Sequence, residues 1–193
     1  MKIGICIGSF NPIHLGHEKM IKSLIKNNDI DMAIVIPAGD NYHLKSNLLS
    51  YTDRYNMLKL SFNNEKIIIS DLEKDKYHYT YENIKLLKEK YINDELYLVI
   101  GADNLVELDT WKNYEYILKN CNFIVYNRNN INIKEYLNNH FTNYKNKIII
   151  KKEIGSVSST LIRNLLKNDD KEASKYLNSD VLNYIIKNNL YRG

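Results

Sequence analysis

The first 37 residues alternate between two kinds of apolar pattern. Residues 3–7 form a short run rich in β-branched side chains that ends at Gly8, which predicts a buried strand. Apolar residues recur at helical spacing within residues 16–26, and residues 32–36 predict a second buried strand that stops at Pro37. Strand, helix and strand in this order form a βαβ unit with parallel strands and a right-handed crossover.

The alternation continues to the end of the chain. The patterns predict strands at residues 66–70, 96–100, 123–126 and 148–150, and helices at residues 51–62, 80–90, 111–119, 158–166, 171–176 and 179–188. No internal repeat or linker interrupts them. We therefore expect an α/β fold: a doubly wound, Rossmann-like parallel sheet with helices on both faces and a helical C-terminal end.

Length and charge limit the kind of protein. With 193 residues the chain has the usual size of one domain, so a single domain over residues 1–193 is the expectation. The net charge of +4 suits an anionic substrate. A nucleic-acid binder usually has a stronger and more clustered bias, whereas the lysines here are spread along the chain. No nucleic-acid partner is expected.

The cysteines and the N-terminus bear on the compartment. Cys6 and Cys121 both lie in apolar runs, which favours reduced, packed thiols over a disulfide framework or a structural zinc site. The N-terminus opens directly into a strand, without the apolar segment and cleavage site of a signal peptide. No apolar run approaches the roughly 20 residues that span a bilayer. We expect a cytoplasmic protein without a membrane partner.

The loop after the first strand is the first candidate for chemistry, because open parallel sheets bind ligands beyond the carboxyl ends of their strands. Gly8 allows a sharp turn and close approach of a phosphate, and Gly16 lies at a helix start that favours anions. His14 and His17 can face one ligand if the helix begins between them, and can then donate to phosphate oxygens. The alternatives are a packed histidine pair or a metal site, for which no third ligand is nearby.

A second candidate anion site lies at residues 155–163. Ser158 or Ser159 would serve as a helix N-cap, which explains one serine. It does not explain Thr160 in the first turn or Arg163 after it, whose rigid fork matches phosphate oxygens. Two such sites at one edge of a sheet suit a triphosphate.

These segments resemble a known family. Residues 8–17 match the G-x-F-x-P-x-H-x-G-H signature of nucleotidyltransferases related to class I aminoacyl-tRNA synthetases, and residues 158–163 resemble the S-S-T-x-I-R signature of their adenylyltransferase branch. Within that branch, I-G-A-D at residues 100–103 followed by Trp111, Y-T at residues 79–80, and residues 181–191 resemble the nicotinate-nucleotide adenylyltransferases. The resemblance covers essentially the whole chain.

The sequence also departs from the family pattern at three places. Asn11 replaces a common Asp, and His78 replaces a common Ser. The family has P-P-H-K after the second strand, whereas His43 here is followed by Leu44 and then Lys45. The first two motifs keep their ATP-binding residues, so the departures concern mainly the acceptor.

The resemblance implies adenylyl transfer from ATP to nicotinate mononucleotide, giving deamido-NAD and pyrophosphate, with Mg²⁺ bound mainly through the ATP phosphates. It assigns catalysis to His14, His17 and Arg163; ATP binding to Gly8, Ser9, Phe10, Gly16, Gly101, Asp103, Ser158, Ser159 and Thr160; and acceptor binding to Lys45, Tyr79, Thr80 and Trp111. Asp103 as a helix cap and Trp111 as a core residue are the alternatives. For Arg54 and Arg128, two further candidates, ordinary ion pairing is an equal explanation.

The sequence leaves three other functions open. Two are enzymes of the same group, a pantetheine-phosphate adenylyltransferase and a nicotinamide-mononucleotide adenylyltransferase. The third is a catalytically silent nucleotide-binding sensor, against which the intact His14, His17 and Arg163 argue. A homo-oligomer is compatible with the sequence, which does not determine the oligomeric state.

Overall fold

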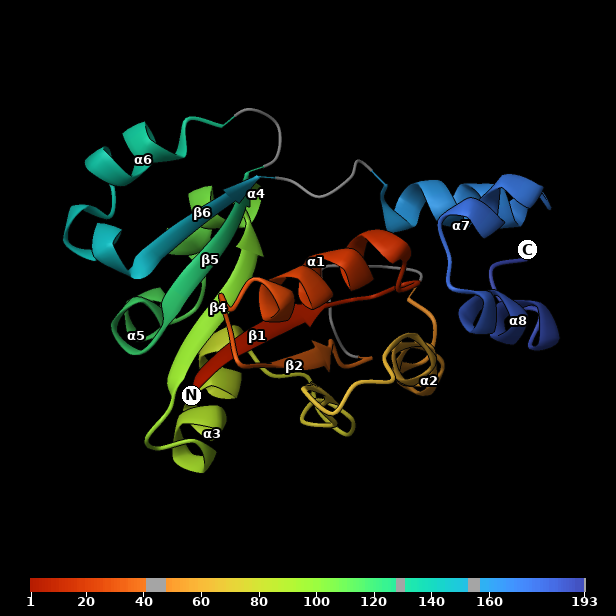
Figure 1. Ribbon diagram of the computed structural model, residues 1–193, viewed down its shortest axis with the longest axis horizontal. Coiled ribbons are helices and arrows are strands. Elements are labelled where there is room, and N and C mark those ends of the chain that lie inside the picture. Colours follow the sequence, from red (N-terminus) through yellow and green to blue (C-terminus); the bar gives the residue numbers. More distant parts are fainter. Residues whose placement is uncertain (41–47, 128–130, 153–156, 193) are drawn as a thin grey trace.

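One parallel sheet forms the centre of the molecule (Figure 1). The computed structural model describes residues 1–40, 48–127, 131–152 and 157–192, and this part of the chain contains six strands. They are β1 (Lys2–Gly8), β2 (Met32–Pro37), β3 (Ile67–Ile69), β4 (Glu95–Gly101), β5 (Asn122–Asn127) and β6 (Ile148–Lys152). Their order is β3-β2-β1-β4-β5-β6, and every neighbouring pair is parallel. The order therefore reverses between β1 and β4.

The central strands are buried on both faces, as is usual for a parallel sheet. In β1, Ile3 and Ile5 belong to the apolar cluster on one face, and Cys6 belongs to the cluster on the other. All three side chains are at most 3% exposed. Since burying an isoleucine side chain contributes about 1.5–3 kcal/mol, the continuous apolar run that predicts this strand also favours its central place in the sheet.

Helices cover both faces of the sheet. They are α1 (Leu15–Lys26), α2 (Tyr51–Ser61), α3 (Thr80–Lys90), α4 (Ala102–Val106), α5 (Tyr114–Asn120), α6 (Ile133–Asn139), α7 (Ser159–Lys167) and α8 (Ser179–Lys187). Buried residues of α1, α2, α7 and α8 share one apolar cluster, and those of α3 to α6 share the other. The two C-terminal helices lie together at one end of the molecule (Figure 1). The predicted doubly wound fold, with helices on both faces and a helical C-terminal end, is confirmed.

Local differences from the predicted elements have simple causes. The helix predicted from residue 111 begins at Tyr114, because Asn113 before it is left-handed, with a φ of 52°. Residues 171–176 form a short 3₁₀ helix, Lys171–Lys175, in place of an α-helix. Two more 3₁₀ helices, Leu108–Thr110 and Thr142–Lys147, and the short α4 and α6 were not predicted. Segments of five to seven residues are too short for a helical period to stand out.

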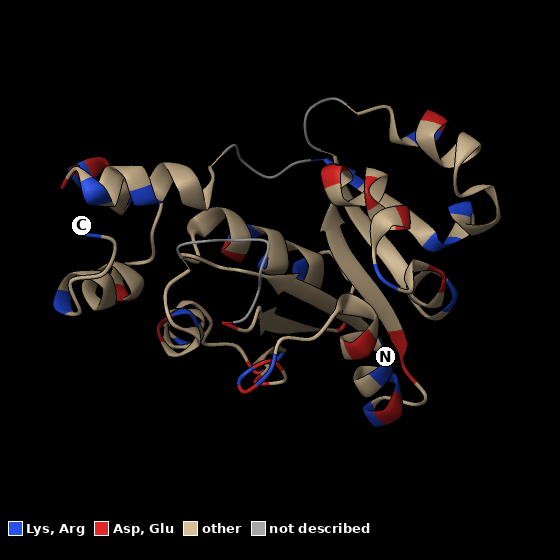
Figure 2. Cartoon of the chain, turned by 180° about the vertical axis from the view of Figure 1, so that it is seen from behind, with Lys and Arg blue, Asp and Glu red and all other residues tan. Residues whose placement is uncertain are grey.

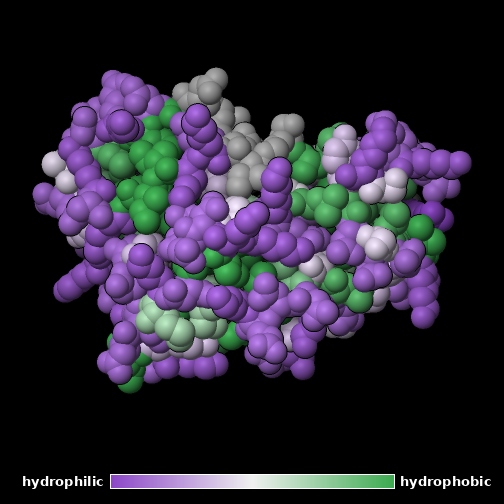
Figure 3. Space-filling view, viewed as in Figure 1, coloured by the Kyte–Doolittle hydropathy of each residue, from purple (hydrophilic) through white to green (hydrophobic). Residues whose placement is uncertain are grey.

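In the view of Figure 2, Lys and Arg are interspersed with Asp and Glu. The face in Figure 3 is mostly hydrophilic, with hydrophobic side chains gathered at the upper left, in the area of α6 and β6. On β6, Ile149 and Ile150 are 37% and 38% exposed. Among the helices that the structure describes, none is long and apolar enough to cross a membrane.

Candidate active site

A cavity of about 1100 Å³ lies at the carboxyl ends of the central strands. Gly8 ends β1 and Gly101 ends β4, and both residues line this cavity. β1 and β4 are the neighbours at which the strand order reverses, which is where open α/β sheets bind their ligands. The cavity therefore occupies the position that the sheet topology favours for a ligand.

The loop after β1 brings His14 and His17 together. α1 begins at Leu15, so the helix does start between the two histidines. Their rings stack with centroids 3.7 Å apart, and the backbone N–H of His17 donates to Nδ1 of the His14 ring over 3.4 Å. A neutral His14 that accepts at Nδ1 carries its proton on Nε2, where it can be donated to a ligand. Both rings line the cavity, so both can approach one anion.

The N-terminus of α7 forms a second wall of the cavity. Ser158 is the N-cap, and its hydroxyl oxygen accepts the N–H of Leu161. Arg163 lies in the next turn and donates from Nη2 to the Thr160 hydroxyl over 3.0 Å. Ser158, Ser159, Thr160 and Arg163 all line the cavity. A helix N-terminus, hydroxyl groups and a guanidinium are a combination suited to phosphate oxygens.

Side-chain hydrogen bonds hold these two walls together, although they are some 150 residues apart in the sequence. The Ser159 hydroxyl donates to the Pro12 carbonyl over 3.0 Å, and Nη1 of Arg163 donates to the Asn11 carbonyl over 2.8 Å. The Asn11 side-chain oxygen accepts the hydroxyl of Tyr191 near the C-terminus. Burial raises the pKa of Tyr191, which therefore stays a neutral donor. The C-terminal segment thus contributes to the shape of the histidine loop.

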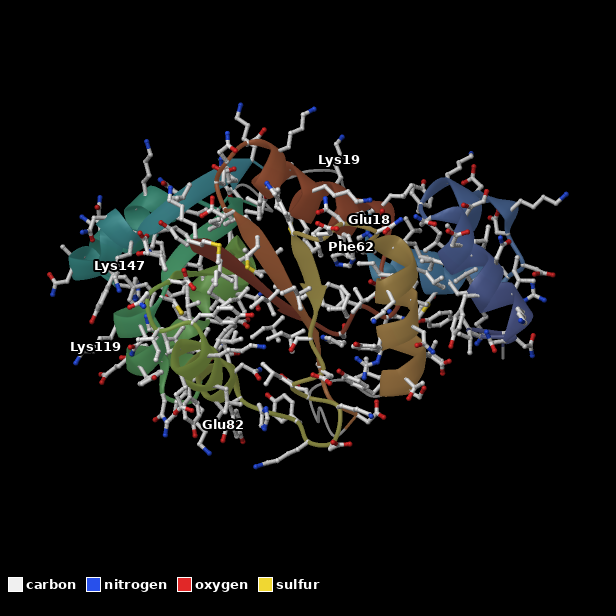
Figure 4. All side chains as sticks on the ribbon, turned by 60° about the horizontal axis from the view of Figure 1, so that its bottom comes forward. Glu18, Lys19, Phe62, Glu82, Lys119 and Lys147 are labelled. Carbon is white, nitrogen blue, oxygen red and sulfur yellow. The ribbon has the colours of Figure 1, made fainter. Side chains whose placement is uncertain are left out.

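A third wall is built from the start of α3 and the segment before α5. Tyr79 is the N-cap of α3 and Thr80 is its first residue. The Tyr79 N–H donates to the carboxylate of Glu82 over 2.8 Å, which fixes the start of the helix (Glu82 is labelled in Figure 4). Trp111 follows the 3₁₀ helix Leu108–Thr110 and is partly exposed. Tyr79, Thr80 and Trp111 line the cavity together.

A buried carboxyl group, Glu73, holds the approach to α3. It is fully buried and accepts the Gly39 N–H over 2.8 Å and the Asn83 side-chain amide over 2.6 Å. Burial raises the pKa of the Glu73 carboxyl, and the hydrogen bond from Gly39 partly offsets that rise. A Cβ at Gly39 would lie 3.0 Å from the Tyr77 backbone, so glycine permits this close approach. The segment before Tyr79 is therefore tied to the end of β2.

Most of the predicted site residues line the cavity. They are Gly8, Ser9, Phe10, His14, His17, Tyr79, Thr80, Gly101, Trp111, Ser158, Ser159, Thr160 and Arg163. Gly16 packs behind this surface: a Cβ there would lie 3.0 Å from the His14 ring and from the Val157 side chain. Asp103 is exposed in the first turn of α4 and is not among the lining residues. Lys45 falls outside the described residues.

Some lining residues carried no signal in the sequence. Asn104, Glu107, Thr110 and Lys112 all reach the cavity from the segment that surrounds Trp111. Lysines are common along the whole chain, so Lys112 resembles any other surface lysine. Apart from its position directly after Trp111, nothing in the sequence indicates that Lys112 lies at the cavity.

Arg54 supports the wall without lining it. This residue is fully buried and donates from Nη1 to the Ser9 carbonyl over 3.0 Å, while Nη2 pairs with Asp40 at 3.0 Å. The contacts favour the ion-pairing interpretation of Arg54 over substrate binding. Arg128 falls outside the described residues.

The cysteines are free and buried, as expected from the sequence. Burial raises the pKa of both Cys6 and Cys121 to about 12, so the thiols stay protonated at neutral pH. Within residues 1–40, 48–127, 131–152 and 157–192, no group of three or more His, Cys, Asp or Glu is placed to hold a metal ion. Most of the described polar side chains that line the cavity can donate hydrogen bonds to an anion, and the carboxylate of Glu107 is the exception.

Comparison with known proteins identifies the family. The cytidylyltransferase-like family model matches residues 5–165. A Fusobacterium nucleatum protein named as a probable nicotinate-nucleotide adenylyltransferase is 41% identical over 191 residues, which cover 97% of this chain and 98% of that protein. The chain belongs to the nicotinate-nucleotide adenylyltransferase family. A protein of the same name from Endomicrobium trichonymphae is 36% identical over 194 residues, which cover 99% of this chain and 99% of that protein.

A solved structure of this adenylyltransferase family has the same fold. It is the Plasmodium falciparum nicotinic acid mononucleotide adenylyltransferase complexed with NaAD, with a TM-score of 0.83 and 26% sequence identity. The match covers 98% of this chain and 97% of that one. Two departures from the adenylyltransferase pattern lie at the cavity of the present chain: Asn11 and His78 both line it.

Proposed function

We propose that this chain transfers the adenylyl group of ATP to nicotinate mononucleotide, forming deamido-NAD and pyrophosphate in NAD biosynthesis. One observation carries the proposal beyond family membership. The paired His14 and His17 and the α7 N-terminus with Arg163 line the same cavity as Trp111 and the start of α3. Such a cavity can hold a triphosphate and an aromatic acceptor side by side.

The reaction mainly requires the protein to position the two substrates and to offset the negative charge of their phosphates. An oxygen of the acceptor phosphate attacks the α-phosphorus of ATP, the bond to the bridging oxygen breaks, and pyrophosphate leaves with the electron pair. In this proposal His17 donates to the α-phosphate as its negative charge redistributes, and Nε2 of His14 donates beside it. Donors that are already fixed before the reaction stabilise a transition state without a cost of reorganisation.

The β- and γ-phosphates would lie against α7. Ser158, Ser159 and Thr160 offer hydroxyl groups and the N-terminus of a nine-residue helix. Arg163 uses two N–H groups to bond Asn11 and Thr160. A guanidinium has five N–H donors, so three remain to bind phosphate oxygens.

Mg²⁺ would accompany ATP as part of the substrate. This ion keeps several waters and binds through few carboxylates and the substrate phosphates, so it would neutralise part of the phosphate charge. Among the described lining residues the one carboxylate is Glu107, which fits an ion held by phosphates better than one held by a protein cage.

The remaining assignments concern adenosine and the pyridine nucleotide. We propose that Gly8, Ser9, Phe10 and Gly101 receive the adenosine half, with Asp103 at the rim near the ribose. Tyr79, Thr80 and Trp111 would hold the pyridine ring, and Lys45 the acceptor phosphate. We further propose a cytoplasmic location; the two buried thiols suit a reducing compartment. Gel filtration of the purified protein decides between a monomer and a homo-oligomer.

The direct test is a pyrophosphate-release assay. The protein is incubated with ATP, Mg²⁺ and one of three acceptors: nicotinate mononucleotide, nicotinamide mononucleotide or pantetheine phosphate. We expect release with nicotinate mononucleotide and formation of deamido-NAD. Release only with pantetheine phosphate would favour the other adenylyltransferase, and silence with every acceptor would favour a nucleotide-binding sensor.

Trp111→Ala separates the two substrates. If Trp111 stacks on the pyridine ring, its loss raises KM for the pyridine nucleotide about tenfold, since an aromatic stacking contact is worth on the order of 1 kcal/mol beyond its buried area. KM for ATP should change much less. Steady-state kinetics with each substrate varied in turn measure both values, and a defect confined to ATP would place Trp111 on the adenosine side.

A further inference from the structure

Lys112 lies at the cavity wall that Trp111 and the start of α3 form, on the side proposed for the pyridine ring. Its Nζ lies 4.3 Å from the centroid of the Tyr79 ring, the shortest of the cation–π contacts among the described residues. Both Lys112 and Tyr79 line the cavity. The ring itself is flanked by two others, Tyr77 at 5.5 Å and Tyr81 at 6.3 Å between centroids. The ammonium group therefore rests on a fixed aromatic face beside the ligand space.

The permanent cations of the cavity lie on different walls. Of the described residues that line it, Lys112 and Arg163 are the Lys and Arg members. Arg163 belongs to α7 and bonds to the histidine loop. Lys112 instead follows Trp111 and rests on the N-cap residue of α3. One cation thus serves the phosphate side, and the other faces the side proposed for the pyridine ring.

The backbone around Lys112 keeps this arrangement in place. The Trp111 N–H donates to the Leu108 carbonyl, and the Tyr114 N–H donates to the Trp111 carbonyl. The Trp111 ring and the Lys112 ammonium are consequently carried by one short, hydrogen-bonded segment. A pyridine ring stacked on Trp111 would have the Lys112 ammonium and the first turn of α3 as its neighbours. N–H groups in the first turn of a helix lack partners within the helix and favour negative charge.

We propose that Lys112 is a specificity-determining residue, which selects an acceptor whose pyridine ring carries a carboxylate over one that carries a carboxamide. The inference rests on the proposed adenylyl transfer to a pyridine mononucleotide. At an exposed site, a cation–π contact stabilises an ammonium group less than a charge-assisted hydrogen bond to a carboxylate does. A carboxylate can therefore draw Lys112 from Tyr79, whereas a neutral amide offers much less in exchange.

The test compares two acceptors in one variant. Lys112→Met keeps the length of the apolar stem and removes the charge. We expect kcat/KM for nicotinate mononucleotide to fall about tenfold, the scale of one charge-assisted hydrogen bond, while kcat/KM for nicotinamide mononucleotide stays within about twofold. The ratio of the two values is the readout, and a general loss of structure would not change it. Lys112→Arg keeps a cation and should retain most of the preference.

Lys59→Met is the matched control. Lys59 also lies over a tyrosine ring, that of Tyr55 at 5.7 Å, but it is on α2 and does not line the cavity. This control should leave the ratio at the wild-type value. An unchanged ratio of the two kcat/KM values in Lys112→Met would overturn the inference. If both values fell equally, the ammonium would be placed on the phosphate that the two acceptors share. A wild-type protein that uses neither acceptor overturns the proposed function as well.

Discussion

Replacing His17 by alanine is expected to lower kcat by about a hundredfold or more, the scale on which loss of one transition-state donor slows an enzyme. The imidazole lies in the first turn of α1, stacks on His14 at 3.7 Å and is braced edge-on by Phe10 at 5.2 Å. A group held from two sides is positioned before the substrate binds. Alanine keeps the helix but removes the donor, so the effect should appear in kcat more than in KM for ATP.

Initial rates of pyrophosphate release at saturating ATP measure the effect. His140→Ala is a suitable control, because His140 also stacks on an aromatic ring, that of Tyr136 at 4.2 Å, yet lies at the end of α6 and does not line the cavity. It should retain the wild-type rate. Turnover by His17→Ala close to that of the control would remove His17 from the catalytic role. Unchanged unfolding curves for both variants exclude loss of the fold as the cause.

The sequence predicts the sheet because its apolar runs have few alternatives. The residues of β1 and β4 are buried on both faces, so they appear as unbroken apolar segments that only a parallel sheet or a buried helix accommodates. The histidine loop is predictable for a different reason. Its glycines, proline and histidines occur at fixed spacings, and each residue type has a separate physical purpose. Both kinds of signal are local, and a local pattern survives in a one-dimensional sequence.

The residues that the sequence did not reveal depend on long-range contacts. Lys112 acquires its place only when the segment before α5 packs against α3. Glu73 looks like one of many surface carboxylates until the fold buries it against Gly39 and Asn83. No periodicity marks either residue, since burial of one charged side chain leaves the surrounding pattern unchanged. Arg54 is a candidate from the sequence, but its full burial and its hydrogen bond to Ser9 also depend on long-range contacts. Its substitution is expected to have the largest effect on stability.

Arg54→Ala is expected to lower the free energy of unfolding by about 3 kcal/mol. Arg54 is fully buried and donates to the carbonyls of Leu49 and Ser9 over 2.8 and 3.0 Å, as well as to Asp40. Alanine would remove the packed side chain and one donor from each of two part-buried carbonyls, and the loss of such a partner costs about 1–3 kcal/mol for a buried group. The Asp40 side chain is 56% exposed and can be solvated, so the ion pair itself adds little to this sum.

Urea unfolding of the wild type and the variant measures this difference in the free energy of unfolding, provided that its slope against urea concentration is the same in both. Arg192→Ala provides the control, because Arg192 pairs with Asp169 at 2.8 Å while their side chains are 42% and 77% exposed. Such surface pairs contribute about 0–1 kcal/mol. Equal, small losses in the two variants would mean that the buried contacts of Arg54 contribute no more than a surface pair. A large loss confined to Arg54→Ala would support the view that this residue anchors the loop after β1. Ser9 lies in that loop and in the cavity wall, so the same substitution should also raise KM for ATP in the protein that remains folded.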